Sequence, residues 1–148
     1  MAECSWQGRA IAPGYAVGEA LVATTALSFF GGVDPESGIV TEKGHVLAGQ
    51  TIAGRILVFP RGKGSTVGSY ILYRLKRAGR APLAIINAEC EPIIAVGCIL
   101  AEIPCADHIP IEQIRNGDYL TVKIGDEGAA ICRHASGTGG EGHCMTQD

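Results

Sequence analysis

The sequence predicts a mixed α/β domain, and three observations lead to that prediction. First, 148 residues with 47% apolar and 18% charged side chains are enough for one folded domain with its own core. Second, a buried-strand pattern at residues 55–59 is followed by a loop, a helical pattern and another buried-strand pattern at 83–86. Third, strand-like segments flank this unit, and 21 Gly with 7 Pro favour many tight turns over a helical bundle.

The N-terminal third is predicted to be β-structure. Residues 7–11 and 19–23 are short candidate strands, separated by a turn at Pro13 and Gly14. The sequence VDPESG at residues 33–38 is rich in turn formers, so the chain should reverse direction there.

The central unit should place two buried strands beside one helix. Residues 55–59 (RILVF) form a compact apolar run, as expected of a strand covered on both faces, and residues 60–65 form the loop after it. Ser65 or Thr66 can cap the helix that follows, and Gly79 can end it. One apolar stripe at helical spacing predicts the helix: Val67, Ile71, Leu75 and Ala78. The connection to the second strand should be right-handed.

A second helix is predicted at residues 93–101, which are almost entirely apolar. Pro92 suits the first helical turn, because the ring fixes a helical φ and the first N–H groups need no partner. Gly97 weakens the helical pattern.

The last ordered element should be a β-hairpin. Residues 119–124 alternate apolar and polar side chains, a turn follows, and the chain returns through residues 129–132. We therefore expect a single domain over residues 1–132. Residues 133–148 are polar and rich in glycine, so a flexible tail is expected there.

Charge and composition exclude several classes of function. The net charge is −3 and there is no basic block, which argues against nucleic acid or an anionic membrane as a partner. There is no apolar run of membrane-spanning length and no N-terminal pattern of a signal peptide, so a cytoplasmic protein is expected. The six cysteines form no C-x-x-C pair, so we expect no metal or cofactor on this chain.

The strongest candidate for chemistry is the glycine-rich loop at residues 61–69, RGKGSTVGS, which lies between a buried strand and a helix. A helix start offers free N–H groups and partial positive charge, which suit an anionic substrate and would stabilise a serine alkoxide. Ser65 is the candidate catalytic base. The expected substrate-binding residues are Arg61, Gly62, Lys63, Gly64 and Thr66. The loop lacks P-loop spacing, and on loop chemistry alone a serine that only caps the helix is slightly favoured.

The other polar candidates are interpreted as structural. Asp34 suits an Asx-turn, and the pair Asp107–His108 lies at a turn bounded by proline. Residues in loops or at helix starts complete this group: His45, Glu89 and Glu91. With one base and no metal site, the chain lacks the acid and Lewis acid that a dehydratase needs, so it is predicted to be incomplete as an enzyme.

The chain resembles the small-subunit family of aconitase X, whose archaeal members are phosphomevalonate dehydratase small subunits. The resemblance covers residues 8–131 in order, and its most specific part is GGVDPESG followed by GKGSTVGSY. Four other stretches carry it: GRAIAPGYAVGEALV, HVLAGQTIAGRILVFPR, APLAIINAECEPIIAVGCILAEIP and NGDYLTVKIGDEGAAI.

The resemblance implies a swivelling β/β/α domain like that of aconitase, and a large partner subunit that carries an iron–sulfur cluster and most of the substrate site. It implies that Ser65 is the proton acceptor. The implied reaction is dehydration of (R)-5-phosphomevalonate to trans-anhydromevalonate 5-phosphate, in archaeal-type mevalonate and isoprenoid biosynthesis. Within the family, cis-3-hydroxy-L-proline dehydratase is the alternative.

The sequence leaves three classes of function open. The chain is an enzyme subunit with Ser65 as base, or a module that only binds an anion, or a cover for a larger protein's site. Each needs a docking surface, and an apolar one is expected. Its candidate members are Phe29, Phe30 and Ile93.

Overall fold

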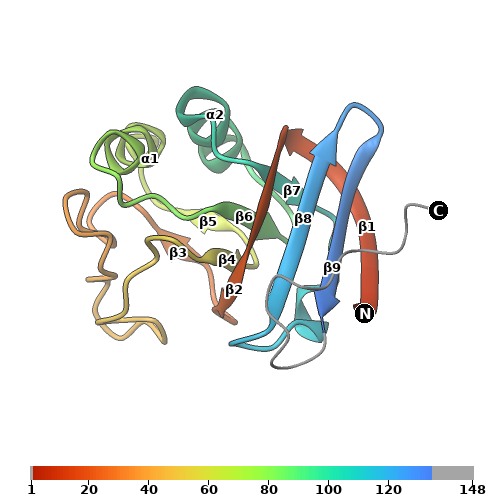
Figure 1. Cartoon of the computed structure of the whole chain (residues 1–148). Helices are drawn as coiled ribbons and strands as arrows, with labels where there is room; N and C mark the ends of the chain where they lie inside the picture. Colours follow the sequence, from red (N-terminus) through yellow and green to blue (C-terminus); the bar gives the residue numbers. More distant parts are fainter. Residues whose placement is uncertain (1, 135–148) are drawn as a thin grey trace.

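The computed structural model describes residues 2–134, and these residues form a closed seven-stranded barrel with two α-helices on one side (Figure 1). Around the barrel the strands follow the order β1-β7-β6-β4-β2-β8-β9. The barrel strands are β1 (Ala2–Ala12), β2 (Gly14–Val22), β4 (Ile56–Phe59), β6 (Ala84–Asn87), β7 (Cys105–Asp107), β8 (Tyr119–Gly125) and β9 (Gly128–His134). The other elements are β3 (Leu27–Ser28), β5 (Gly62–Lys63), α1 (Gly68–Arg77), α2 (Pro92–Ala101) and the 3-10 helix Ile111–Gln113.

The barrel has a parallel part and an antiparallel part. Strands β2, β4, β6 and β7 are mutually parallel neighbours, whereas β1, β8 and β9 run antiparallel to their neighbours. Figure 1 shows β1, β8 and β9 on the side of the barrel away from α1. The loops after the parallel strands therefore gather at one end, as ligand-binding loops do in other parallel sheets.

Buried strand β4 separates two hydrophobic cores. Ile56 and Val58 point into the barrel with Leu120 and Val122 of β8. Leu57 and Phe59 face the other way, toward the helices. Every residue of β4 is buried, which confirms the prediction from its continuous apolar run.

The first helix begins later than the sequence suggested. Its N-cap is Val67, without a side-chain hydrogen bond, so neither Ser65 nor Thr66 caps α1. The expected stripe is partly wrong, because Val67 and Ala78 are exposed while Leu72 is buried with the predicted Ile71 and Leu75. Gly79, with φ of +74°, follows the last helical turn as predicted.

The second helix begins as predicted, with Pro92 in its first turn. The Glu91 carboxylate accepts hydrogen bonds from the N–H groups of Ile93 and Ile94, 2.9 and 3.2 Å away, and so caps the helix. Gly97 has a packing role, because a Cβ there would lie 2.5 Å from Leu72 Cδ1 of α1. The glycine that weakens the helical pattern thus allows the two helices to approach closely.

The strands are longer than predicted at both ends of the chain. Strands β1 and β2 extend beyond the expected residues 7–11 and 19–23, and β9 continues through His134, past the expected end of the domain at residue 132. The rest of the expected tail, residues 135–148, lies outside the described residues. Among the described residues, no helix is both long enough and apolar enough to cross a bilayer.

Candidate functional site

The glycine-rich loop leaves β4 at the carboxyl end of the parallel strands. Its first residues form β5, which pairs in parallel with β3, so that Leu27 lies opposite Gly62 and Ser28 opposite Lys63. This pairing ties the loop to the segment that follows β2. The loop is therefore built into a small sheet, and its glycines lie against neighbouring elements.

Two of those glycines lie where a larger residue would collide. A Cβ on Gly64, whose φ is +91°, would lie 2.6 Å from Ser28 Oγ. A Cβ on Gly62 would lie 2.6 Å from Glu91 Oε1, at the capped start of α2. The loop thus packs between β3 and the start of α2, and close backbone approach is the reason for both glycines.

Ser65 is exposed at the positive end of α1. Its Oγ accepts a hydrogen bond from the N–H of Val67 at 3.1 Å, and its carbonyl oxygen accepts from the N–H of Gly68 at 2.9 Å. The hydroxyl therefore stabilises the turn before the helix, in a position that a second polypeptide can reach. Thr66, next to it, is also exposed.

Lys63 forms an ion pair within the chain. Its Nζ lies 2.7 Å from Glu42 Oε2, and Glu42 Oε1 accepts from the N–H of Ser28 at 3.1 Å. Burial acts to raise the pKa of Glu42, but the contacts with Lys63 and the Ser28 N–H outweigh burial, and the pKa is lowered. Arg61 is exposed at the start of the loop.

A second polar cluster lies along the same end of the barrel; three of its members are among those interpreted from the sequence as structural, whereas no sequence pattern pointed to Arg9. Asp107, fully buried at the end of β7, accepts two hydrogen bonds from the Arg9 guanidinium, at 2.9 and 2.7 Å. It also accepts from the N–H of Cys90 at 2.7 Å, and His108 Nε2 lies 3.9 Å away. Three side chains each offer one potential ligand atom, and these atoms lie within 4.8 Å of one another, a spacing suited to a metal ion. The residues are Glu89, Asp107 and His108. Asp107, however, already accepts three hydrogen bonds from Arg9 and Cys90, and the Arg9 guanidinium balances its charge.

Comparison with known proteins identifies the family. Residues 5–131 match the aconitase X swivel domain. The chain belongs to the aconitase X swivel-domain family. It is 54% identical over 125 residues to the phosphomevalonate dehydratase small subunit of Methanosarcina acetivorans, covering 82% of this chain and 86% of that relative. It is 52% identical to the subunit of the same name from Thermococcus onnurineus, covering 82% and 93% of the two chains.

A solved structure agrees with the swivel-domain assignment. The crystal structure of Thermococcus kodakaraensis aconitase X in its holo-form matches with a TM-score of 0.86 and 45% identity. The match covers 89% of this chain and 99% of that one. The prediction of an aconitase-type swivel domain is therefore confirmed.

Several side chains of this swivel domain have structural roles, as expected. Ser37 Oγ donates to Asp34 Oδ2 at 2.6 Å, and the N–H of Glu36 points at Oδ1, so Asp34 forms the predicted Asx-turn. His45 lies in a loop and is buried, where its Nδ1 accepts from the N–H of Leu47.

The predicted docking residues are only partly exposed. Phe29 is buried against Phe59, with ring centroids 6.1 Å apart, so its prediction as a contact residue is wrong. Phe29 directly follows β3 and is buried, as is Leu27 two residues before it. Phe30 is exposed and Ile93 is half-buried.

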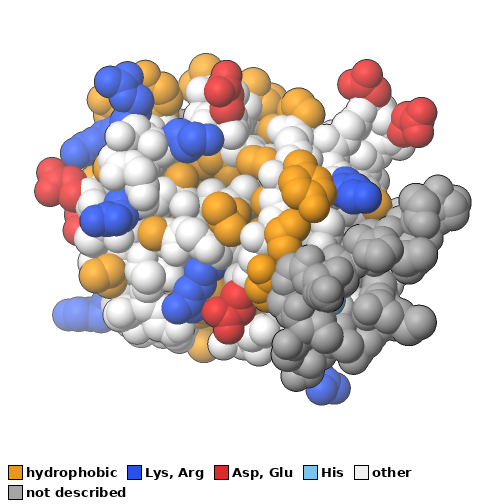
Figure 2. Space-filling view, viewed as in Figure 1, with side chains coloured by type: hydrophobic (Ala, Val, Ile, Leu, Met, Phe, Trp, Pro, Cys, Tyr) orange, Lys and Arg blue, Asp and Glu red, His pale blue; other side chains and the backbone are white. Residues whose placement is uncertain are grey.

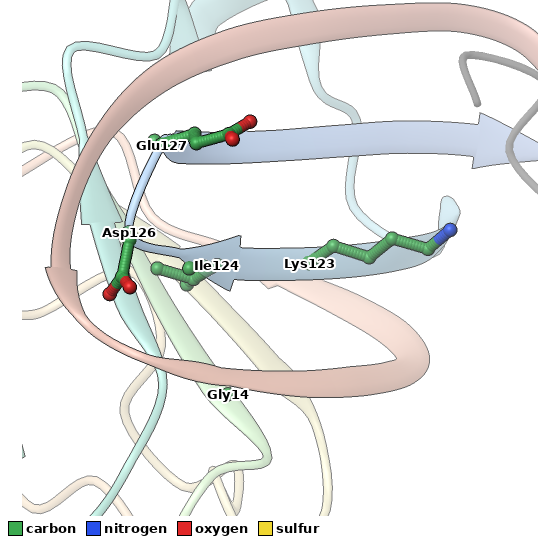
Figure 3. Close-up of a pocket in the computed structure, with 7 residues that line it drawn as sticks. Gly14, Lys123, Ile124, Asp126 and Glu127 are labelled. Carbon is green, nitrogen blue, oxygen red and sulfur yellow. The ribbon is translucent and has the colours of Figure 1, made fainter. Parts of the chain in front are cut away.

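A hollow of about 450 Å³ at the β8–β9 turn is remote from the loop (Figure 3). It includes Gly14, the first residue of β2, and therefore lies at the opposite end of the barrel from the loops that follow the parallel strands. Figure 3 shows the carboxylates of Asp126 and Glu127 directed apart and Lys123 extended along β8. Because these groups do not converge, the hollow is no candidate for the functional site.

Proposed function

We propose that this chain is the cytoplasmic small subunit of a heteromeric, iron–sulfur-dependent hydro-lyase that dehydrates (R)-5-phosphomevalonate to trans-anhydromevalonate 5-phosphate. The observation that carries the proposal is the 50% or greater identity to archaeal proteins named phosphomevalonate dehydratase small subunit, over most of both chains. The exposed Ser65 in a glycine-rich loop supports the assignment of a chemical role to this subunit.

In the proposed reaction Ser65 is the proton acceptor. Its deprotonated Oγ takes a proton from C2 of the substrate, and the electron pair of that C–H bond forms the C2=C3 double bond. The C3–O bond breaks with its electrons on oxygen, which takes up a proton and leaves as water. The iron–sulfur cluster supplies, when bound, the Lewis acidity that holds the leaving hydroxyl.

The surroundings of Ser65 favour an alkoxide. The N–H of Val67 already points at Oγ from 3.1 Å, and the hydroxyl lies at the N-terminal end of α1, where the helix dipole is positive. Arg61 adds positive charge to the same loop, and Lys63 suits the phosphate or carboxylate of the substrate once that group displaces Glu42. Ser65 therefore supports the backbone turn and also presents a base.

We place the iron–sulfur cluster on the large subunit because the free thiols described in this chain are poorly suited to bind it. Iron–sulfur clusters are held by thiolates. Contact with the Cys105 thiol and burial raise the pKa of Cys90 far above its usual range. Contact with Cys90 acts to lower the pKa of Cys105, but the Cys98 thiol and burial outweigh it and the pKa is raised. Cys98 is buried in the helix-side core. These side chains are packing groups rather than ligands.

The test is reconstitution with the large subunit of the same organism under anaerobic conditions. We expect the complex to convert (R)-5-phosphomevalonate to its anhydro product, measured by mass spectrometry, and not to dehydrate cis-3-hydroxy-L-proline. Turnover of hydroxyproline alone would instead establish the alternative member of the family, and turnover of neither would refute the proposal.

A second arm tests Ser65. Ser65→Ala should assemble normally and lower kcat by about 100- to 10,000-fold, the usual contribution of a general base. Ser37→Ala, which removes a serine from the Asp34 turn, is the matched control and should keep wild-type turnover. Near-normal turnover by Ser65→Ala would leave this chain as an anion-binding or covering module.

A further inference from the structure

Helix α2 has an outer face that no residue of the described range 2–134 covers. Its ten residues, PIIAVGCILA, include no charged side chain. Val96, Ile99 and Leu100 lie on one face of the helix and are 48%, 56% and 60% exposed. A helix that is apolar all round is normally buried on all sides, so α2 has the composition of a helix covered by a further protein layer.

A groove runs between this face and α1. It has a volume of about 410 Å³ and is lined by Thr66, Ser69, Tyr70, Tyr73 and Leu100. The rings of Tyr70 and Tyr73 are stacked, with centroids 6.2 Å apart and an interplanar angle of 28°. Tyrosines with an apolar body and a polar tip are enriched at protein interfaces.

Positive charge borders the groove on the α1 side. Arg77 donates to Tyr73 Oη at 3.0 Å and lies over the same ring, 5.8 Å from its centroid. Arg74 is exposed one turn away, 4.0 Å from Glu36. With Arg77 it lines a neighbouring hollow that shares Tyr70 and Tyr73 with the groove. Figure 2 shows hydrophobic side chains along the upper edge of the molecule, over the two helices, with Lys and Arg side chains at the end nearer α1.

We propose that the α1–α2 face binds the large subunit; we define this face as Tyr70, Tyr73, Val96, Ile99 and Leu100. The inference rests on the proposed function, which requires a partner. The groove begins at Thr66, directly after Ser65, so a polypeptide that encloses Ser65 meets this face next. The matching surface of the large subunit is apolar and carries carboxylates opposite Arg74 and Arg77.

The positive charge beside the groove favours the large subunit over a second copy of this chain as the partner. In a two-fold symmetric contact the same patch meets itself, so the arginines bordering the groove would approach one another. Like charges across an interface are unfavourable, whereas a large subunit with carboxylates there gains attraction. The large subunit is therefore the occupant that fits the face.

The test measures affinity for the purified large subunit by calorimetry. We expect the double variant Ile99→Gln with Leu100→Gln to weaken binding by about 100-fold, because two exposed anchors would no longer be buried in the complex. The matched control is Tyr15→Gln, which changes an equally exposed side chain on β2 and should bind as the wild type does. Thermal unfolding of each isolated variant tests whether folding is intact.

Two outcomes would overturn the inference. A change of less than about threefold in the double variant, with folding intact, overturns it. Sedimentation that shows a dimer of the isolated chain, dissociated by the double variant while the large subunit still binds, assigns the face to a second copy and also overturns it. Because binding is measured without substrate, the face can be confirmed even if the complex fails to dehydrate phosphomevalonate.

Discussion

The ammonium group of Lys63 lies 2.7 Å from the carboxylate of Glu42, so the lysine of the glycine-rich loop is neutralised within this chain. The other oxygen of Glu42 holds the N–H of Ser28 on the paired strand β3. An anionic substrate that uses Lys63 must therefore compete with Glu42. This competition makes Glu42 relevant to substrate affinity although it lies in a distant loop.

Glu42→Gln should strengthen substrate binding in the reconstituted complex. The amide oxygen can still accept from the Ser28 N–H, but the charge that competes for Lys63 is gone. Partly exposed ion pairs contribute about 0.2–1 kcal/mol, so KM for phosphomevalonate should fall about 1.4- to fivefold with kcat little changed. Lys63→Gln should raise KM. A higher KM in Glu42→Gln would instead show that Glu42 positions Lys63 for the substrate.

Gly64→Ala should destabilise the loop through its contact with Ser28. A positive φ of +91° already disfavours alanine, and the new Cβ would lie 2.6 Å from Ser28 Oγ. We expect a loss of about 1–3 kcal/mol in the free energy of unfolding, measured by urea titration. Gly31→Ala is the control for backbone strain alone, because its φ is +84° and nothing lies within 4 Å of the new Cβ.

The double variant Gly64→Ala with Ser28→Ala isolates the steric part. Without Ser28 Oγ the nearest atom to the new Cβ is Ser28 Cβ at 3.4 Å, an ordinary contact. The double variant should therefore be more stable than additivity of the two single changes predicts. Strict additivity would show that the collision is relieved by movement of the loop.

Local patterns were sufficient to predict the parts of the fold that depend on neighbours in the sequence. The apolar run RILVF predicted a buried strand, Pro92 predicted the start of α2, and Gly79 predicted the end of α1. Periodicity could not show the closure of the barrel, because β1 pairs with β7 and β9 about a hundred residues away. The start of α1 was misplaced because Ser65 is a good capping residue by type, yet its hydroxyl stabilises the preceding turn.

Local patterns likewise predicted one part of the candidate site and missed another. The glycine-rich loop is contiguous, so its composition and its place before a helix were visible in the sequence. The pairs Lys63–Glu42 and Arg9–Asp107 join residues far apart in the chain, and each member alone resembles an ordinary surface charge. In the sequence Asp107 stands out only as the neighbour of His108, and no local pattern links Asp107 to Arg9.

The Arg9–Asp107 pair predicts unequal effects of its two members on stability. The Asp107 side chain is fully buried, whereas that of Arg9 is 51% exposed. Arg9→Ala leaves a buried carboxylate with the Cys90 N–H as its nearest donor, so it should lower the free energy of unfolding more than Asp107→Asn does. Asp107→Asn removes the buried charge, and Arg9 can then be solvated by water. The free energy of unfolding should therefore fall by about 1–2 kcal/mol. Urea titration at pH 7 measures both, and an equal or smaller loss in Arg9→Ala would contradict the argument.

The same pair should make the protein sensitive to acid. Burial acts to raise the pKa of Asp107, but the Arg9 guanidinium and the Cys90 N–H outweigh it, so the pKa in the folded protein lies below the usual value of about 3.9. A carboxyl group with a lowered pKa stabilises the fold above its ordinary pKa, and this contribution is lost as the pH falls through the folded value. Thermal unfolding should therefore show a smaller loss of Tm between pH 7 and pH 3 in Asp107→Asn than in the wild type. Asp126→Asn, in the exposed β8–β9 turn, should follow the wild type. Equal losses of Tm in Asp107→Asn and the wild type would show that the acid sensitivity arises from other carboxylates.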